Sequence, residues 1–208
     1  MEKILEVEDV FKSFYTSSGT VRALNGVSLS VKQGKTIGLV GESGSGKTTL
    51  GRAIVGLLNA DKGNVIFDQK KIGKKVNIRH LDLRGKIQLV FQEPSESLDP
   101  RIKVGLSICE PLRGLGVSKK EWVQRLDVVS KQVGLNSEQL EQYPSQLSAG
   151  QQQRAGIARA LITKPKLIVL DEPTSALDPT ARAEILSMLQ EVQKETGVSY
   201  IYISHDLS

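Results

Sequence analysis

The sequence has little cysteine and no long apolar run. Its 208 residues include one cysteine, Cys109, so no disulfide can form within the chain, which indicates a reducing cytosolic setting. Cys109 is expected to be a small, buried apolar residue. No stretch approaches the roughly 18 apolar residues of a membrane helix. The first residues, MEKILEVEDV, carry acids where a signal peptide carries bases. The sequence therefore predicts a chain that is soluble by itself.

An excess of one charge is also missing from most of the chain. The formal net charge is +5, and residues 68–86 alone supply it, with seven Lys or Arg against two Asp. Such a basic run could attract the phosphates of nucleic acid or of anionic lipid. It lacks the interleaved aromatic residues that stack on bases, and it lies between two expected strands. A solvated hairpin or loop over 70–86 is therefore favoured, and no nucleic acid is expected as a partner.

The length suits one domain, and hydrophobic patterning predicts an α/β fold. Residues 4–31 alternate apolar and polar positions around a turn at 16–19, as antiparallel strands do. Three short, continuously apolar runs predict strands buried on both faces, and two longer patterns predict helices. The runs are 36–40, 167–170 and 198–203, and the helical patterns are 47–58 and 180–196.

The middle of the chain differs from both ends. Residues 93–147 show helical patterns and no strong strand, and a capping box from Ser118 to Glu121 opens the helix expected over 119–133. We therefore predict one domain over 1–208, with a helical insertion at 93–150. Residues 1–92 would hold an α/β core with an antiparallel β subdomain, and 151–208 would return to the core.

A phosphate-binding loop lies between the first expected buried strand and its helix. Residues 41–48 fit the pattern GxxxxGK[ST], in which glycines let successive backbone N–H groups point inward beside a helix N-terminus. Lys47 would contact the β- and γ-phosphates, Thr48 would bind Mg²⁺, and Thr49 could reach the α-phosphate. The candidate ATP-binding residues are Gly41, Glu42, Ser43, Gly44, Ser45, Gly46, Lys47, Thr48 and Thr49.

Two adjacent acids follow the apolar run at 167–170. An acidic pair after a strand is often only a helix cap, but here a phosphate loop lies upstream. Because neighbouring residues on a strand point in opposite directions, Asp171 could face Mg²⁺ while Glu172 polarises the water that attacks the γ-phosphate.

A second helix N-terminus carries small residues and a serine. Leu147-Ser-Ala-Gly-Gln151 opens a helix expected to end near Thr163, and it is either a simple helix cap or a second anion site. Only the first site has a lysine and metal ligands. Two copies facing each other head to tail could therefore share Ser148, Gly150 and Gln151 across a composite site.

In its order of motifs, the sequence resembles the ATPase domain of ABC proteins over nearly its whole length. The phosphate loop is followed by LSAGQQQR, LIVLDEP with SALD, and a histidine. The resemblance implies that Gln92 contacts Mg²⁺ and the attacking water. It implies that Asp178 couples the two sites and that His205 contacts the γ-phosphate. Phe14 matches the aromatic residue that stacks on adenine, although Tyr15 could take that role.

Two departures from the family pattern stand out. Ala149 occupies a position where the family usually has glycine, which adds a methyl group beside the partner's phosphate. The sequence ends at Ser208, where family members continue, so we expect a shortened or incomplete chain whose last strand would be exposed and prone to aggregation.

Three further segments narrow the resemblance to the ATPase subunits of dipeptide, oligopeptide and nickel importers. They are 92–101, 108–112 and 143–147. This implies ABC permease subunits as partners, a second ATPase subunit, and a peripheral position at the cytoplasmic face of the membrane. Residues 93–101 are the candidate permease-facing surface. The alternatives are an ABC ATPase acting on ribosomes or nucleic acid, and a nucleotide-binding regulator without hydrolysis, which the two acids disfavour.

Overall fold

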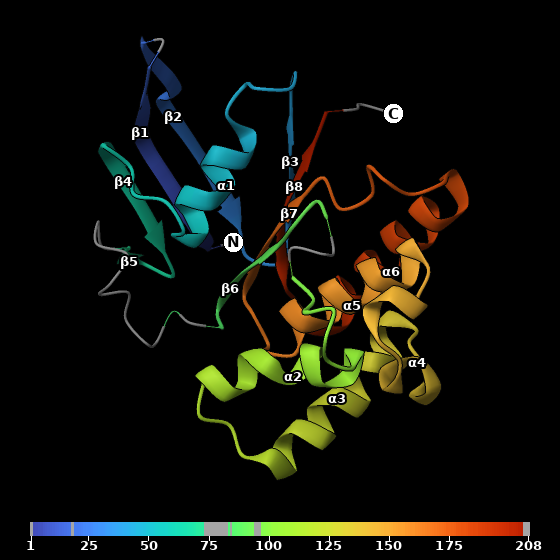
Figure 1. Cartoon of the computed structure of the whole chain (residues 1–208). Helices are drawn as coiled ribbons and strands as arrows, with labels where there is room; N and C mark the ends of the chain where they lie inside the picture. Colours follow the sequence, from blue (N-terminus) through green and yellow to red (C-terminus); the bar gives the residue numbers. More distant parts are fainter. Residues whose placement is uncertain (1, 18, 73–82, 84, 94–96, 206–208) are drawn as a thin grey trace.

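The computed structural model describes residues 2–17, 19–72, 83, 85–93 and 97–205, which form two sheets with helices packed against them (Figure 1). The antiparallel sheet has the strand order β2-β1-β4-β5, and the parallel sheet has the order β3-β8-β7-β6. The predicted α/β fold is thus confirmed. The strands are β1 Lys3–Thr16, β2 Gly19–Lys32, β3 Thr36–Val40, β4 Lys62–Phe67, β5 Lys70–Lys71, β6 Ile87–Val90, β7 Leu167–Asp171 and β8 Ser199–Ser204.

The parallel sheet has its most apolar strands in the middle. β7 lies between β6 and β8 in parallel register, and all five of its residues are buried. β8 is also internal, between β3 and β7, so the expectation of an exposed last strand was wrong. β3 is instead an edge strand among the described residues. Thr36, Gly38 and Val40 are exposed, which corrects the prediction that this strand is buried on both faces.

Helix α1 (Lys47–Val55) fills the space between the two sheets (Figure 1). Its buried Leu50 and Ile54 belong to a cluster that includes strand residues of both sheets, such as Leu5 and Val169. The helix is shorter than the predicted 47–58. Gly56 adopts a left-handed conformation (φ 80°) and its N–H bonds back to the carbonyl of Arg52, which ends the helix.

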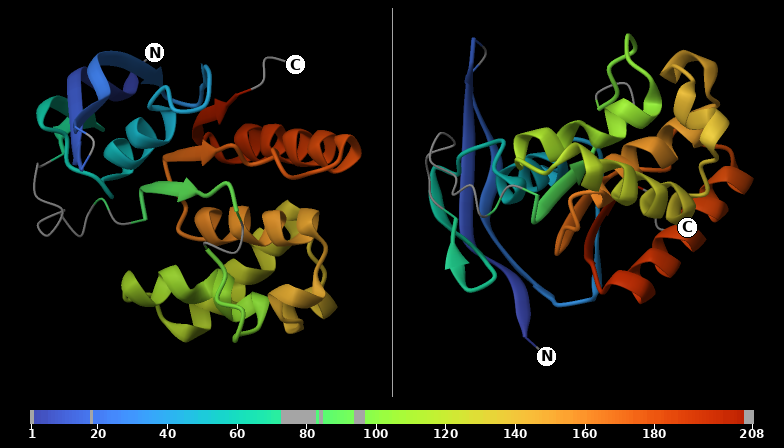
Figure 2. Two further views of the ribbon diagram at one scale, coloured as in Figure 1. Left: turned by 45° about the horizontal axis from the view of Figure 1, so that its top comes forward. Right: turned by 90° about the horizontal axis from the view of Figure 1, so that it is seen from below.

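The remaining helices lie on the other side of the parallel sheet from β1 and β2, as Figure 2 also shows. The expected helical insertion contains α2 and α3, together with a short α4. α5 packs against α2 and α3 and connects this part to β7. Their bounds are α2 Val104–Gly114, α3 Lys119–Val133, α4 Ser137–Glu141, α5 Ala149–Leu161 and α6 Pro179–Thr196.

Two local predictions in this region have different outcomes. Cys109 is buried in α2, with 3% of its surface exposed, as expected, and burial raises its pKa to about 11. Ser118 caps α3 by accepting from the N–H of Glu121. The reciprocal half of the predicted capping box is not formed, because the Glu121 carboxylate pairs instead with Arg125 at 2.6 Å.

The basic segment 70–86 lies only partly within the described residues. Lys70 and Lys71 form β5, which pairs with β4, and both are exposed. The stretches 73–82 and 84 lie outside the described residues. None of the helices in the described part of the chain combines the length and the apolar character that crossing a membrane requires.

Gly63 in β4 offers a test of the antiparallel sheet. It has φ +89° opposite an irregularity in β1, and a Cβ there would overlap the backbone oxygens of Asp9 and Glu8. We expect Gly63→Ala to lower the free energy of unfolding by about 2 kcal/mol or more, because backbone strain and a clash act together. Urea denaturation would measure this.

Gly114→Ala is the matched control, since nothing lies within 4 Å of a Cβ added at this end of α2. It should leave the urea midpoint unchanged or raise it slightly. Equal stability of the two variants would contradict the assigned register between β1 and β4.

Candidate active site

The glycine loop leads from the end of β3 into α1. Gly44 and Gly46 have φ values of +79° and +96°, which L-residues with a side chain rarely adopt. Gly46 is also the N-cap of α1, and a Cβ there would overlap the carbonyl oxygen of Ala23 in β2. Gly44 is thus required by backbone conformation, and Gly46 both by backbone conformation and by close contact with the antiparallel sheet.

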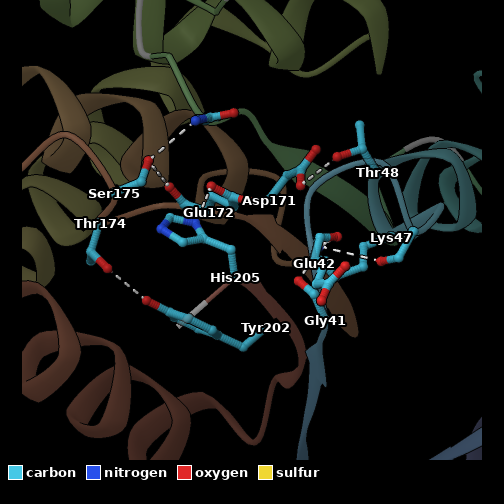
Figure 3. A network of polar contacts seen from close by, with 12 residues as sticks. Gly41, Glu42, Lys47, Thr48, Asp171, Glu172, Thr174, Ser175, Tyr202 and His205 are labelled. Carbon is cyan, nitrogen blue, oxygen red and sulfur yellow. Dashed lines mark hydrogen bonds and ion pairs between the residues drawn. The ribbon is translucent and has the colours of Figure 1, made fainter. Parts of the chain in front are cut away.

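Lys47 folds back over this loop (Figure 3). Its ammonium donates to the carbonyl oxygens of Gly41 at 2.7 Å and Glu42 at 2.8 Å. The exposed residues of the loop are Glu42, Ser43, Gly44 and Ser45. The loop therefore encloses a positive charge beside the N-terminus of α1, where an anion is stabilised.

The side chains of Thr48 and Asp171 come from different elements and contact each other (Figure 3). The Thr48 hydroxyl at the start of α1 donates to the Asp171 carboxylate at the end of β7, over 3.0 Å. Asp171 is only 7% exposed. Two hard oxygen ligands thus lie side by side at the carboxyl edge of a parallel sheet, where such sheets bind their ligands.

Glu172 lies just beyond β7 and beside His205. Its N–H donates to the carbonyl of Ile203, and its carboxylate lies 2.9 Å from Nδ1 of His205 (Figure 3). Glu172 has φ +47° and is not a strand residue. The sequence pattern predicted that the alternation of strand side chains separates Asp171 from Glu172. This prediction was wrong, because only Asp171 belongs to the strand. A left-handed turn after the strand separates the two acids instead.

Gln92 and Ser175 complete this group. Gln92 follows β6, and its amide nitrogen lies 3.4 Å from the hydroxyl of Ser175, which donates to the backbone oxygen of Glu172 at 3.0 Å. Ser175 was not predicted, although it opens the SALD motif three residues after Glu172. Behind it, Thr174 and Tyr202 are hydrogen bonded at 2.8 Å.

The second predicted group surrounds a separate hollow of about 440 Å³. Ser148, Gly150, Gln151 and Asp178 line it, together with Ala149, whereas Lys47 and Thr48 do not. Within the single chain their side chains cap helices. Ser148 and Gln151 form a capping box on α5, and Asp178 accepts from Thr180 and Ala181 at the start of α6. A larger hollow of about 540 Å³, beside α3, contains none of the candidate residues.

Phe14 lies on β1, in the antiparallel sheet, and is 38% exposed, whereas Tyr15 is 88% exposed. The ammonium of Lys12 lies 5.6 Å from the centre of the Phe14 ring. Asp61 holds this lysine at 2.8 Å and also accepts from the N–H of Ser13. The Lys12 hydrogen bond is the main cause of a lowered pKa at Asp61. Phe14 is thus the more fixed of the two aromatic residues.

The donor set fits a magnesium ion that arrives with phosphates. Thr48 and Asp171 supply hard oxygens, and the described part of the chain has no group of three or more acids, His or Cys that could hold a metal alone. Mg²⁺ commonly takes one or two protein oxygens and completes its shell with water and substrate phosphates. The residues therefore suit a bound Mg²⁺-nucleotide.

Known proteins resemble this chain in both sequence and fold. The oligopeptide transport ATP-binding protein OppF of Bacillus subtilis is 44% identical over 100% of this chain and 69% of the relative. AmiF of Streptococcus pneumoniae, of the same description, is 43% identical over 100% of this chain and 68% of the relative.

Two solved structures superpose closely on the chain. The dimeric post-hydrolysis ATP-binding cassette MJ0796, bound to ADP and Pi, has a TM-score of 0.86 and 30% identity, covering 98% of this chain and 88% of the other. CbiO1 of Clostridium perfringens, part of the ABC transporter complex cbiONQ, has a TM-score of 0.84 and 32% identity, covering 99% and 80%. The family profile described as ABC transporter matches residues 24–175. The chain therefore belongs to the ABC transporter family, as an ATPase of that family.

Proposed function

We propose that this chain is the ATP-hydrolysing subunit of an importer for oligopeptides, acting at the cytoplasmic face of the membrane. The observation that supports this most strongly is the pairing of Thr48 with Asp171 beside Glu172 and His205 at one edge of the parallel sheet. The likeness to oligopeptide transport ATP-binding proteins along the whole chain supports the choice of cargo. In this proposal residues 1–208 act as one ATPase domain, with the helical part at 93–150.

The phosphates of ATP would lie over the glycine loop. Lys47 and the inward backbone N–H groups would neutralise the β- and γ-phosphates, and Thr49 would contact the α-phosphate. Thr48, Asp171 and Gln92 would hold Mg²⁺, which supplies positive charge to the phosphate oxygens when bound. Phosphoryl transfer needs mainly such positioning and charge neutralisation.

Glu172 would accept the proton of the attacking water. Its carboxylate is anchored by His205 at 2.9 Å, and its backbone is fixed to β8 and to Ser175. His205 would thus orient the carboxylate and also reach the γ-phosphate. Gln92, which touches Ser175, would report the state of this site to the permease-facing segment that follows it.

The hollow bounded by Ser148 and Asp178 would receive the nucleotide of a second copy. A capped helix N-terminus such as that of α5 favours an anion. The lining of this hollow has no lysine, and its Arg154 is paired with Glu184. A facing copy would supply the phosphates on its own glycine loop. The dimeric form of the similar cassette MJ0796 supports the pairing of two copies.

Residues 93–101 would face the permease, and their described part is shaped by an ion pair. Arg101 and Asp99 lie 2.8 Å apart, and the hydrogen bonds from Arg101 lower the pKa of Asp99 to about 2. Arg101 is 84% exposed beyond this contact. Leu106, in the first turn of α2, is 58% exposed nearby in sequence.

Replacing Glu172 tests the chemistry. We expect Glu172→Gln to lower ATP turnover about a hundredfold or more, because the amide cannot accept a proton, while the affinity for ATP is kept. Phosphate release and fluorescent-nucleotide binding would measure the two. Glu191→Gln, at an exposed site on α6, is the control and should turn over normally. Normal turnover in Glu172→Gln would assign the base elsewhere.

Adenine stacking is tested by two neighbouring variants. Phe14→Ala should raise the KM for ATP roughly tenfold with little change in kcat, since stacking on a base contributes about 1–3 kcal/mol. Tyr15→Ala should leave the KM unchanged. Steady-state kinetics would measure both, and a raised KM in Tyr15→Ala alone would move the role to Tyr15.

The permease-facing surface is tested by charge reversal. Arg101→Glu should reduce co-purification with the oligopeptide permease subunits and uptake of a labelled peptide, while the isolated chain hydrolyses ATP as before. Lys131→Glu is the control, since Lys131 forms a similar exposed ion pair with Asp127 on α3. Undiminished co-purification of Arg101→Glu would place the contact outside residues 93–101.

A further inference from the structure

Helices α5 and α6 begin at the same hollow. Ser148 is the N-cap of α5 and Asp178 is the N-cap of α6, and both residues line the cavity of about 440 Å³. Under the proposed function, these two N-termini face the other copy's nucleotide. Their separation would then decide whether both segments reach it at once.

An ion pair joins α5 to α6 at the same number of residues from the two N-caps. Arg154 lies six residues after Ser148, and Glu184 lies six residues after Asp178. Nη2 of Arg154 is 2.8 Å from Oε2 of Glu184. Because an α-helix rises about 1.5 Å per residue, this contact lies about 9 Å from each N-cap.

The same guanidinium also holds α3. Nη1 of Arg154 donates to the carbonyl oxygen of Val133, the last residue of α3, at 2.8 Å. The next residue, Gly134, has φ +69°, and a Cβ there would lie 3.0 Å from Nη1. The close approach of Arg154 to the end of α3 is therefore matched by a glycine at the point of contact.

This ion pair is expected to constrain the two helices more strongly than an ordinary surface ion pair would. Exposed pairs contribute little to stability, about 0–1 kcal/mol. The Arg154 side chain, however, is only 19% exposed, and its planar fork has two acceptors in fixed directions, although Glu184 is 59% exposed. Loss of the Glu184 carboxylate would leave a mostly buried guanidinium without its charged partner and remove one contact between α5 and α6.

We infer that Arg154 and Glu184 are positioning residues for ATP hydrolysis. They fix the spacing between the loop at Ser148 and the loop at Asp178, and they connect both loops to the end of α3. Both residues line the hollow, but they act on hydrolysis through the two loops whose spacing they set. This inference rests on the proposed function, because the spacing matters only if a second copy uses the hollow.

A second ion pair on α5 provides a matched comparison. Arg159 pairs with Glu110 of α2 at 2.8 Å, with exposures of 28% and 56% that resemble those of Arg154 and Glu184. This pair joins α5 to α2 and does not involve α6. Removing its carboxylate changes the same kind of contact on the same helix without affecting the spacing of the two loops.

The test compares Glu184→Gln with Glu110→Gln, and uses Arg154→Lys as a second variant. We expect Glu184→Gln to lower kcat and the ATP-driven dimer affinity about fivefold to tenfold, within the range of coupled contacts. Dimerisation would be measured by sedimentation in a Glu172→Gln background. Fluorescent-nucleotide binding to the monomer should be unchanged, because the glycine loop lies elsewhere. Glu110→Gln should keep wild-type kcat and dimer affinity.

The conservative variant separates geometry from charge. Arg154→Lys keeps the charge, but a lysine cannot present two fixed N–H groups to Val133 and Glu184 together. It should therefore lose kcat like Glu184→Gln, and the double variant should lose no more than either alone. A purely structural role predicts instead that any loss of kcat accompanies a loss of stability, seen as a lower melting temperature. It also predicts this in both Glu184→Gln and Glu110→Gln.

The outcomes distinguish this inference from the proposed function. If the unchanged chain neither hydrolyses ATP nor dimerises with it, the proposed function fails and the inference fails with it. If the unchanged chain does both, and Glu184→Gln and Arg154→Lys match it, the inference alone is refuted. Equal losses in Glu110→Gln and Glu184→Gln would also refute it.

Discussion

The hydrogen bond between Thr48 and Asp171 is the contact on which the geometry of the site depends. It joins the first turn of α1 to the carboxyl end of β7, at 3.0 Å. α1 packs between the two sheets, so this bond also fixes the glycine loop relative to the parallel sheet. Glu172 and Ser175 follow directly after β7. Their placement therefore depends on a strand whose five residues are all buried.

Much of this arrangement could be predicted from the sequence because it follows from local rules. Continuous apolar runs indicated three strands of the parallel sheet, and the bounds of β3 and β7 follow the predicted segments closely. The phosphate loop was recognised from Gly41, Gly46 and Lys47 in the context of a strand and a helix. The convergence of Thr48 and Asp171 follows from parallel strands whose carboxyl ends meet at one edge.

The remaining features depend on tertiary contacts that no local pattern encodes. The sequence could not show that β8 is inserted between β3 and β7, which leaves β3 at the edge of the described sheet. It also could not show that Glu121 pairs with Arg125 rather than with its own helix N-terminus. Arg154 stood within a recognised motif, yet its partner Glu184 is 30 residues away, and only the packing of α5 on α6 brings them together.

The hydrogen bonds of Lys47 to its own loop affect what the nucleotide affinity of a variant without this lysine would measure. Its ammonium bonds to two carbonyl oxygens of its own loop, so the loop is preorganised around the charge. Preorganisation reduces the entropy lost when a ligand is captured. Removing the lysine would therefore abolish an attraction and also loosen the backbone that presents the other donors. The affinity lost in such a variant measures both effects together and overstates the Coulombic share of the ammonium.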